Sequence, residues 1–331
     1  MELSRRRLLQ LMIGAGCCSA ALLPIRAANR SALRVGLISD LNSSYGSTSY
    51  IPSVHQGVER LIALQPDLVV CAGDMVAGQM RGLSGQQLDA MWRGFEAAVL
   101  QPLQMAGIPL LPAIGNHDGS PGFAADRAAV SRFWPPIRSR MGLGFVDASQ
   151  FPFRYTVLQE GIFWLVWDAS SARVPEDQLV WAQQQLAGTK AQAARARFVV
   201  GHLPLVGVGQ GKDRPGEVLD RASELQALME NAGVQGYISG HHHAWFSGRR
   251  GQLDLIQLGA LGSGPRRLLD GGTSAQQTFT LLEMDGVRDA IKETTYAVSS
   301  GEPLAWSTLP ARLKTRAGLL QRNSSERLLR G

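Results

Sequence analysis

The chain has 331 residues, of which 45% are hydrophobic and 18% are charged. These values are typical of a globular protein and argue against a disordered or fibrous one, and the length allows a substantial buried core. The formal net charge is +6, but residues 1–27 carry four arginines against one glutamate. The rest is only modestly basic and has no obvious basic stripe, so we expect no specific nucleic-acid partner.

The first 27 residues have the parts of an export signal: a basic start, an apolar middle and a small-residue end. Residues 4–10 read Ser-Arg-Arg-Arg-Leu-Leu-Gln, which resembles the twin-arginine signal, and Ala27 is a suitable cleavage position. The apolar stretch 11–23 is shorter than the roughly 20 residues that span a bilayer. We therefore expect a signal peptide over 1–27 that the twin-arginine export machinery recognises. The mature chain is expected to be periplasmic or extracellular, without a stable transmembrane span.

The positions of the cysteines limit disulfide formation, and the signal segment leaves two alternatives open. Cys17 and Cys18 lie in the apolar signal segment, where lipidation or an uncleaved membrane anchor is the alternative to simple cleavage. After cleavage only Cys71 remains, so the mature chain cannot form an internal disulfide. Cys71 lies in an apolar run, and we expect it to be a small buried residue.

From residue 31 onward, apolar runs alternate with helical patterns. In chain order we expect strands at 33–38, 67–72, 109–114, 154–158, 162–167, 198–200, 234–239, between 245 and 282, and at 290–298. Helices are expected at 54–64, 86–105 (broken near Pro102), 124–134, 175–186 and 223–231. This alternation predicts an α/β core. We expect one domain over 31–300, followed by a basic tail at 301–331 that is solvated or partly helical.

Five of the six histidines lie in short polar motifs that follow apolar runs, and only His55, an expected surface residue, lies elsewhere. Motifs that directly follow parallel strands lie together at the carboxyl edge of the sheet, where open α/β sheets place their sites. Glycine precedes four of the five motif positions and permits close backbone approach. Imidazoles with carboxylates suit Zn, Mn or Fe. The motifs are Asp40, Gly73-Asp74, Gly115-Asn116-His117-Asp118, Gly201-His202 and Gly240-His241-His242-His243.

As a set, these motifs resemble the signature of the calcineurin-like metallophosphoesterases: D-x-H, G-D, G-N-H-D/E, G-H and G-H-x-H, in that order. The resemblance covers roughly residues 33–260. It implies an α/β fold of two sheets in a sandwich flanked by helices (αββα). It also implies two divalent metal ions, with Mn, Fe or Zn as the expected elements, and the hydrolysis of phosphoesters. Two such ions activate a water molecule for in-line attack on phosphorus.

The resemblance assigns a role to each matching position. Asp40 and His243 would bind the first metal, and Asp74 would bridge both. The second metal would be bound by Asn116, His202 and His241. His117 would be the general acid or phosphate contact, oriented by Asp118, because a protonated imidazole stabilises charge on a leaving oxygen. His242 takes the unspecified position and is not expected to be a ligand.

Asn42 departs from the family pattern, which has histidine at this position. We predict that Asn42 binds the first metal or holds a water molecule that does. Purple acid phosphatases also lack this histidine but have a tyrosine three residues after the bridging aspartate. Ala77 occupies that place here, which argues against an iron–tyrosinate centre, and only Tyr45 or Tyr50 could approach from the preceding loop.

Four basic residues are candidate substrate contacts. Lys212 and Arg214 lie in a glycine-rich loop after His202, and this loop lacks the Ser/Thr of a nucleotide-binding P-loop. Arg266 and Arg267 follow a second glycine-rich stretch.

The sequence therefore predicts an exported, metal-dependent phosphohydrolase that acts on a small phosphomonoester or phosphodiester. One alternative is a pyrophosphatase that acts on a nucleotide or lipid-linked diphosphate. Another is a metal-bound binding or sensor protein with little turnover, which Asn42 would favour.

Overall fold

A computed structural model describes residues 32–262, 264–272 and 274–329. The predicted signal peptide, with Cys17 and Cys18, lies outside these residues. Within the described ranges, no helix is both long and apolar enough to cross a membrane.

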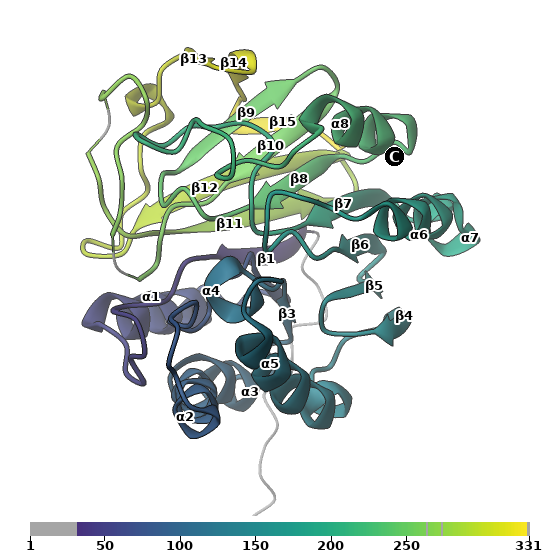
Figure 1. Ribbon diagram of the computed structural model, residues 1–331. Coiled ribbons are helices and arrows are strands. Elements are labelled where there is room, and N and C mark those ends of the chain that lie inside the picture. Colours follow the sequence, from purple (N-terminus) through teal and green to yellow (C-terminus); the bar gives the residue numbers. More distant parts are fainter. Residues whose placement is uncertain (1–31, 263, 273, 330–331) are drawn as a thin grey trace, which may run out of the picture. The chain divides into compact units, whose positions relative to one another are not determined.

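Two mixed β-sheets form the centre of the structure (Figure 1). The first has the strand order β15-β12-β11-β1-β2-β3, and the second has the order β13-β14-β9-β10-β8-β7-β6-β5-β4. The strands of the first sheet are β1 (Ala32–Ile38), β2 (Leu68–Cys71), β3 (Leu110–Pro112), β11 (Thr278–Asp285), β12 (Ala290–Ala297) and β15 (Glu326–Leu328). Those of the second are β4 (Phe145–Gln150), β5 (Arg154–Gln159), β6 (Ile162–Val166), β7 (Ala196–Val200), β8 (Gly236–Ser239), β9 (Phe246–Arg250), β10 (Leu253–Gln257), β13 (Arg312–Thr315) and β14 (Gly318–Arg322).

Helices cover the outer faces of both sheets (Figure 1). The first sheet is covered by α1 (Pro52–Ala63), α2 (Gly85–Phe95), α3 (Gln101–Met105) and α5 (Ala124–Ile137). The second is covered by α6 (Glu176–Ala187), α7 (Thr189–Gln192) and α8 (Ala222–Asn231). The short α4 (Asn116–Gly119) follows β3, and single turns of 3₁₀ helix lie at Arg138–Arg140 and Trp306–Thr308.

Buried side chains form three apolar layers, one between the two sheets and one between each sheet and its helices. In β2, Leu68 and Val70 point between the sheets, whereas Val69 and Cys71 point toward the helices of the first sheet. A strand presents successive side chains to opposite faces, so a strand that is apolar throughout is buried on both. This arrangement confirms the predicted αββα sandwich and the burial of Cys71.

The predicted break near Pro102 takes another form. The chain stays helical from α2 to α3, through a π-helical segment at Glu96–Leu100, where the N–H of Gln101 donates to the carbonyl of Glu96. Proline lacks an N–H and its ring collides with the carbonyl four residues earlier. The wider π turn just before Pro102 is the kind of local adjustment that relieves this collision without ending the helix.

The prediction of a solvated or partly helical tail is wrong. Strands β13 and β14 extend the second sheet beyond β9, and β15 pairs with β12 of the first sheet. In β13, Leu313 and Thr315 are buried, while Arg312 and Lys314 are exposed. In β13, two of the basic residues that suggested a solvated tail therefore alternate with buried residues.

Arg327 on β15 joins the two sheets. Its guanidinium lies 2.7 Å from Asp254 Oδ2 on β10 and 2.9 Å from Glu293 Oε2 on β12. Both carboxylates are fully buried, and only 6% of the Arg327 side chain is exposed. Arg327 thus supplies a cation to two buried carboxylates, of which Asp254 also pairs with Arg249.

We predict that Arg327→Ala lowers the free energy of unfolding by about 3–5 kcal/mol, because it removes the cation paired with the buried Glu293 carboxylate and one of the two cations paired with Asp254. Urea unfolding of the purified protein measures this loss. Arg288→Ala, which removes an exposed arginine paired with Asp285, is the matched control and should cost far less. Equal small losses in both variants would contradict the structural role of Arg327.

Candidate metal centre

The predicted ligands lie just beyond strand ends, as the sequence indicated. Asp40 follows β1, Asp74 follows β2, and Asn116 follows β3. His202 follows β7, and the His241–His243 segment follows β8. Strands β1, β2 and β3 run parallel, as do β7 and β8. Their carboxyl ends therefore bring residues from distant parts of the chain to the same edge of the sandwich.

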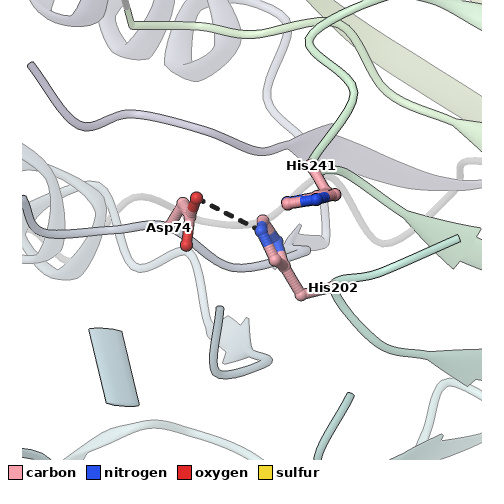
Figure 2. A group of neighbouring side chains, drawn as sticks. All are labelled: Asp74, His202 and His241. Carbon is pink, nitrogen blue, oxygen red and sulfur yellow. Dashed lines mark ion pairs between the residues drawn. The ribbon is translucent and has the colours of Figure 1, made fainter. Parts of the chain in front are cut away.

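Two groups of side chains gather there with Asp74 common to both. Asp40, Asp74 and His243 form one group, and Asp74, His202 and His241 form the other. Within each group the possible ligand atoms lie within 4.8 Å of one another. His243 Nε2 lies 3.2 Å from Asp40 Oδ1, and His202 Nε2 lies 3.2 Å from Asp74 Oδ2. Figure 2 shows Asp74, His202 and His241 converging from three separate segments.

The two predicted amide ligands also lie at these groups. Asn116 Oδ1 is 3.0 Å from His202 Nε2, and its amide Nδ2 donates to Gln79 Oε1 at 2.7 Å. The amide is thereby oriented with its oxygen toward the group of Asp74, His202 and His241. Asn42 is buried two residues after Asp40, and its backbone N–H donates to the Asp74 carbonyl at 3.2 Å. The role of the Asn42 side chain stays a prediction.

The second ring nitrogen of each histidine in these groups is held by an acceptor. His202 Nδ1 lies 2.7 Å from the Ala72 carbonyl, and His243 Nδ1 lies 2.8 Å from the Gly264 carbonyl. His241 Nε2 lies 2.7 Å from Glu217 Oε2. Because these oxygens only accept, the facing nitrogens carry the hydrogen and the other nitrogen of each ring is left for a metal.

The backbone is strained where the groups meet. Asp40, Asp74, His241 and His243 have φ between 53° and 69°, a left-handed region that non-glycine residues adopt at a cost. Gly73 has φ 94°, and a Cβ there would lie 2.6 Å from His202 Nδ1. A Cβ on Gly240 would lie 2.6 Å from Asp40 Oδ2. The expected close approach of the backbone at these glycines is confirmed.

The electrostatics favour a cation. Burial alone would raise the pKa of Asp74, but the charges of His202 and His117 outweigh it and the pKa is lowered. Burial would lower the pKa of His202, but the carboxylates of Asp74 and Asp40 raise it to about 9. Burial lowers the pKa of His241 to about 4, so this ring is neutral, as a ligand must be. The carboxylates that raise the pKa of His202 also attract a divalent ion, which would take the place of the proton on Nε2.

His117 borders the shared aspartate. Its backbone N–H donates to Asp74 Oδ1 at 2.8 Å, and its ring Nδ1 donates to the Gly78 carbonyl at 3.2 Å. The ring Nε2 lies 4.0 Å from Asp74 Oδ2, and 20% of the side chain is exposed. The ring of Tyr45, an exposed residue, lies 5.2 Å away between centroids. His117 is thus partly exposed, and its Nε2 lies on the side of the shared aspartate.

Asp118 orients His117 differently from the prediction. Its carboxylate accepts hydrogen bonds from the backbone N–H groups of Gly115 (2.8 Å) and Val76 (2.9 Å) instead of from the imidazole. It joins the turn after β3 to the turn after β2, and so fixes the backbone that carries His117. Tyr50, one of the two tyrosines that could approach the site, donates its hydroxyl hydrogen to the Met75 carbonyl at 2.6 Å.

The four predicted substrate residues fall in two places. Lys212 Nζ and Arg214 Nη2 lie 2.8 Å and 3.0 Å from the carboxylate oxygens of Glu217. Arg266 lines a cavity of about 340 Å³ together with His243, Trp245 and Leu304. Arg267 is exposed, and its carbonyl accepts from the N–H of Gln210. Of these four residues, Arg266 lines a cavity together with His243, a member of the two ligand groups.

Sequence reasoning missed Glu217. It stands in an irregular loop between a glycine and a valine, and no local pattern marks it as a contact of His241. His242, which was not expected to be a ligand, indeed has both ring nitrogens occupied: Nδ1 accepts from the Val208 N–H and Nε2 donates to the Glu217 carbonyl. Two adjacent histidines therefore contact the same residue.

The donor set fits divalent transition metals. Each group combines carboxylate oxygen with imidazole nitrogen, the mixture that suits Zn, Mn or Fe. Both groups are largely buried, and the second ring nitrogens are already bonded, as in metal sites whose ligands are oriented in advance.

Solved structures share this fold. A purple acid phosphatase from yellow lupin (Lupinus luteus) seeds has a TM-score of 0.62 and 15% identity, over 83% of this chain and 53% of that one. The chain thus spans about half the length of the lupin enzyme. A Plasmodium protein described as the anchor in the inner membrane complex has a TM-score of 0.55 and 14% identity, over 83% of this chain and 87% of that one.

At such identities the likeness shows the fold alone, and no curated protein sequence matches the chain significantly. The sequence model of one family, described as calcineurin-like phosphoesterase, does match, over residues 33–245. This match covers most of the chain and includes all five motifs that supply the grouped side chains. The chain therefore belongs to the calcineurin-like phosphoesterases.

Proposed function

We propose that the chain is a dinuclear-metal phosphohydrolase that cleaves a phosphomonoester or phosphodiester. The observation that carries this proposal is the position of Asp74, whose carboxylate is common to both ligand groups. Asp40, Asn42 and His243 would hold the first ion, and Asn116, His202 and His241 the second. When bound, two such ions polarise the phosphoryl oxygens and supply a nucleophilic water at neutral pH.

His117 is proposed as the general acid or phosphate contact. Since Nδ1–H donates to the Gly78 carbonyl, Nε2 is the atom available to a leaving oxygen on the partly exposed side of the centre. Asp118 keeps the turn in place, so that the ring and Asp74 retain their separation. The buried surroundings exclude bulk water from the grouped side chains, which strengthens each electrostatic contact with substrate.

The cavity beside His243 is proposed to receive part of the substrate. Arg266 supplies positive charge at its wall, while Trp245 and Leu304 supply apolar surface. The exposed ring of Tyr45 lies on the His117 side of the centre. A phosphoester with a compact organic group matches this mixture of cationic, aromatic and aliphatic surface.

We predict that the mature protein binds two metal ions per chain and hydrolyses p-nitrophenyl phosphate or bis-p-nitrophenyl phosphate. His117→Ala should lower kcat by about 10²–10⁴-fold, because general acid catalysis contributes roughly that factor. Metal analysis and a colorimetric assay with added Mn, Zn or Fe measure both quantities. His55→Ala, which replaces an exposed histidine on α1, is the matched control and should retain full activity.

The same assay separates the main alternative. The Plasmodium protein described as an anchor has a similar fold, so the fold alone does not establish turnover. Two bound ions with no turnover on either ester would favour a metal-bound binding protein. Turnover that survives His117→Ala would leave the proposed acid without support.

Asn42 is proposed to bind the first ion directly or through water. We predict that Asn42→Ala weakens the first metal site and leaves the second in place, because Asn42 follows Asp40 and not His202. Metal analysis after dialysis against a weak chelator measures the loss. Two ions retained with unchanged affinity would rule out this role.

We also propose that the protein is exported, on the basis of residues 4–10. Replacing the pair Arg5 and Arg6 with lysine is expected to stop translocation by the twin-arginine route, so that unprocessed protein accumulates in the cytoplasm. Cell fractionation and immunoblotting measure this. Arg7→Lys changes the neighbouring variable position and should export normally, whereas normal export of the double variant would contradict the proposal.

A further inference from the structure

Glu217 lies in the irregular segment between β7 and α8, yet its carboxylate reaches the candidate metal centre. Oε2 lies 2.7 Å from His241 Nε2 and 2.8 Å from Lys212 Nζ. Oε1 lies 3.0 Å from Arg214 Nη2. Only 16% of the Glu217 side chain is exposed. One partly buried carboxylate therefore contacts two cations and one grouped histidine at once.

This contact determines which nitrogen His241 offers to a metal. A carboxylate only accepts hydrogen bonds, so Nε2 carries the hydrogen and Nδ1 keeps the lone pair that can join Asp74 and His202. His202 and His243 are held in the same manner by main-chain carbonyls. Of the three, His241 alone has a full negative charge behind its ring, and such a partner makes the imidazole a stronger donor to metal.

Glu217 is itself held by a folded loop. The Leu269 N–H donates to the Val208 carbonyl at 2.8 Å, and the Gln210 N–H donates to the Arg267 carbonyl at 2.9 Å. His242 adds a further link, because its Nε2 donates to the Glu217 carbonyl at 2.8 Å. The Glu217 N–H in turn donates to the Arg214 carbonyl at 3.2 Å. Both backbone polar groups of Glu217 are thus bonded, while Lys212 and Arg214 contact the two oxygens of its carboxylate.

We propose that Glu217 is a positioning residue that fixes the tautomer and orientation of His241 and thereby sets the affinity of the second metal site. Lys212 and Arg214 act through Glu217 by holding its carboxylate in place, rather than by contacting substrate. The inference deepens the proposed function and rests on it, since it requires that the group of Asp74, His202 and His241 binds a metal ion.

The test is calorimetric titration of the metal-free protein with Mn²⁺ or Zn²⁺. His243→Ala and His202→Ala assign the binding steps to the first and second sites. Glu217→Ala is expected to weaken the second step by about 10–100-fold, the usual effect of removing a partner of a metal-bound histidine, and to leave the first step unchanged. Glu217→Gln should weaken it less, because the amide oxygen still accepts from Nε2–H but carries no charge.

Controls separate positioning from loop structure. Glu224→Gln removes the same charge from an exposed glutamate paired with Arg221, and both affinities should be retained. Lys212→Met combined with Arg214→Met should also weaken the second step. At low metal concentration the Glu217 variants should lose activity, and excess metal should restore it.

Three outcomes would overturn the inference. Second-site affinity unchanged in Glu217→Ala and in Glu217→Gln would show that the contact does not tune the metal. Equal weakening of both steps would show a general structural role. A wild-type chain that binds no ion would overturn this inference and the proposed function together, whereas two ions without turnover would overturn only the function.

Discussion

Asp74 is the residue on which the geometry of the site depends. Its Oδ1 accepts from the His117 N–H, its Oδ2 faces His202 Nε2, and its carbonyl accepts from the N–H groups of Leu41 and Asn42. These contacts tie together the turns after β1, β2, β3 and β7. The left-handed backbone at Asp74, with φ 55°, makes this possible, because it turns the chain sharply as it leaves the strand. A site built this way cannot lose its shared carboxylate without also losing the alignment of His117.

The sandwich supplies the rigidity that such a strained edge requires. Apolar side chains on one face of these strands pack between the two sheets, and those on the other face pack under the helices. The strand ends therefore have little freedom to move. Left-handed conformations at Asp40, Asp74, His241 and His243 persist only where surrounding structure determines them. Arg327 contributes from the far end of the chain by linking Asp254 and Glu293 across the two sheets.

The loop between β7 and α8 places a charged network beside one candidate ligand. In the structure Lys212, Arg214, Glu217, His241 and His242 form one connected network instead of a set of independent contacts. Lys212 and Arg214, which the sequence suggested as substrate contacts, are paired with the Glu217 carboxylate. That carboxylate in turn contacts the candidate ligand His241. Arg266 lines the cavity that includes His243 and is the basic residue that we propose for substrate contact.

The sequence by itself determined the α/β core and the motif residues at the carboxyl edge, and the resemblance of those motifs to a known family added the αββα sandwich. Apolar runs and the motifs that follow them are local features, and parallel strands bring their ends to one edge wherever they pair. Tertiary structure alone decided the contact between Glu217 and His241, because it depends on the path of an irregular loop. It also decided that Asp118 fixes the backbone rather than the ring of His117, and that the basic tail forms strands. Strand pairing at an edge depends on which edges β9 and β12 leave open, and no local pattern in residues 312–328 carries that information.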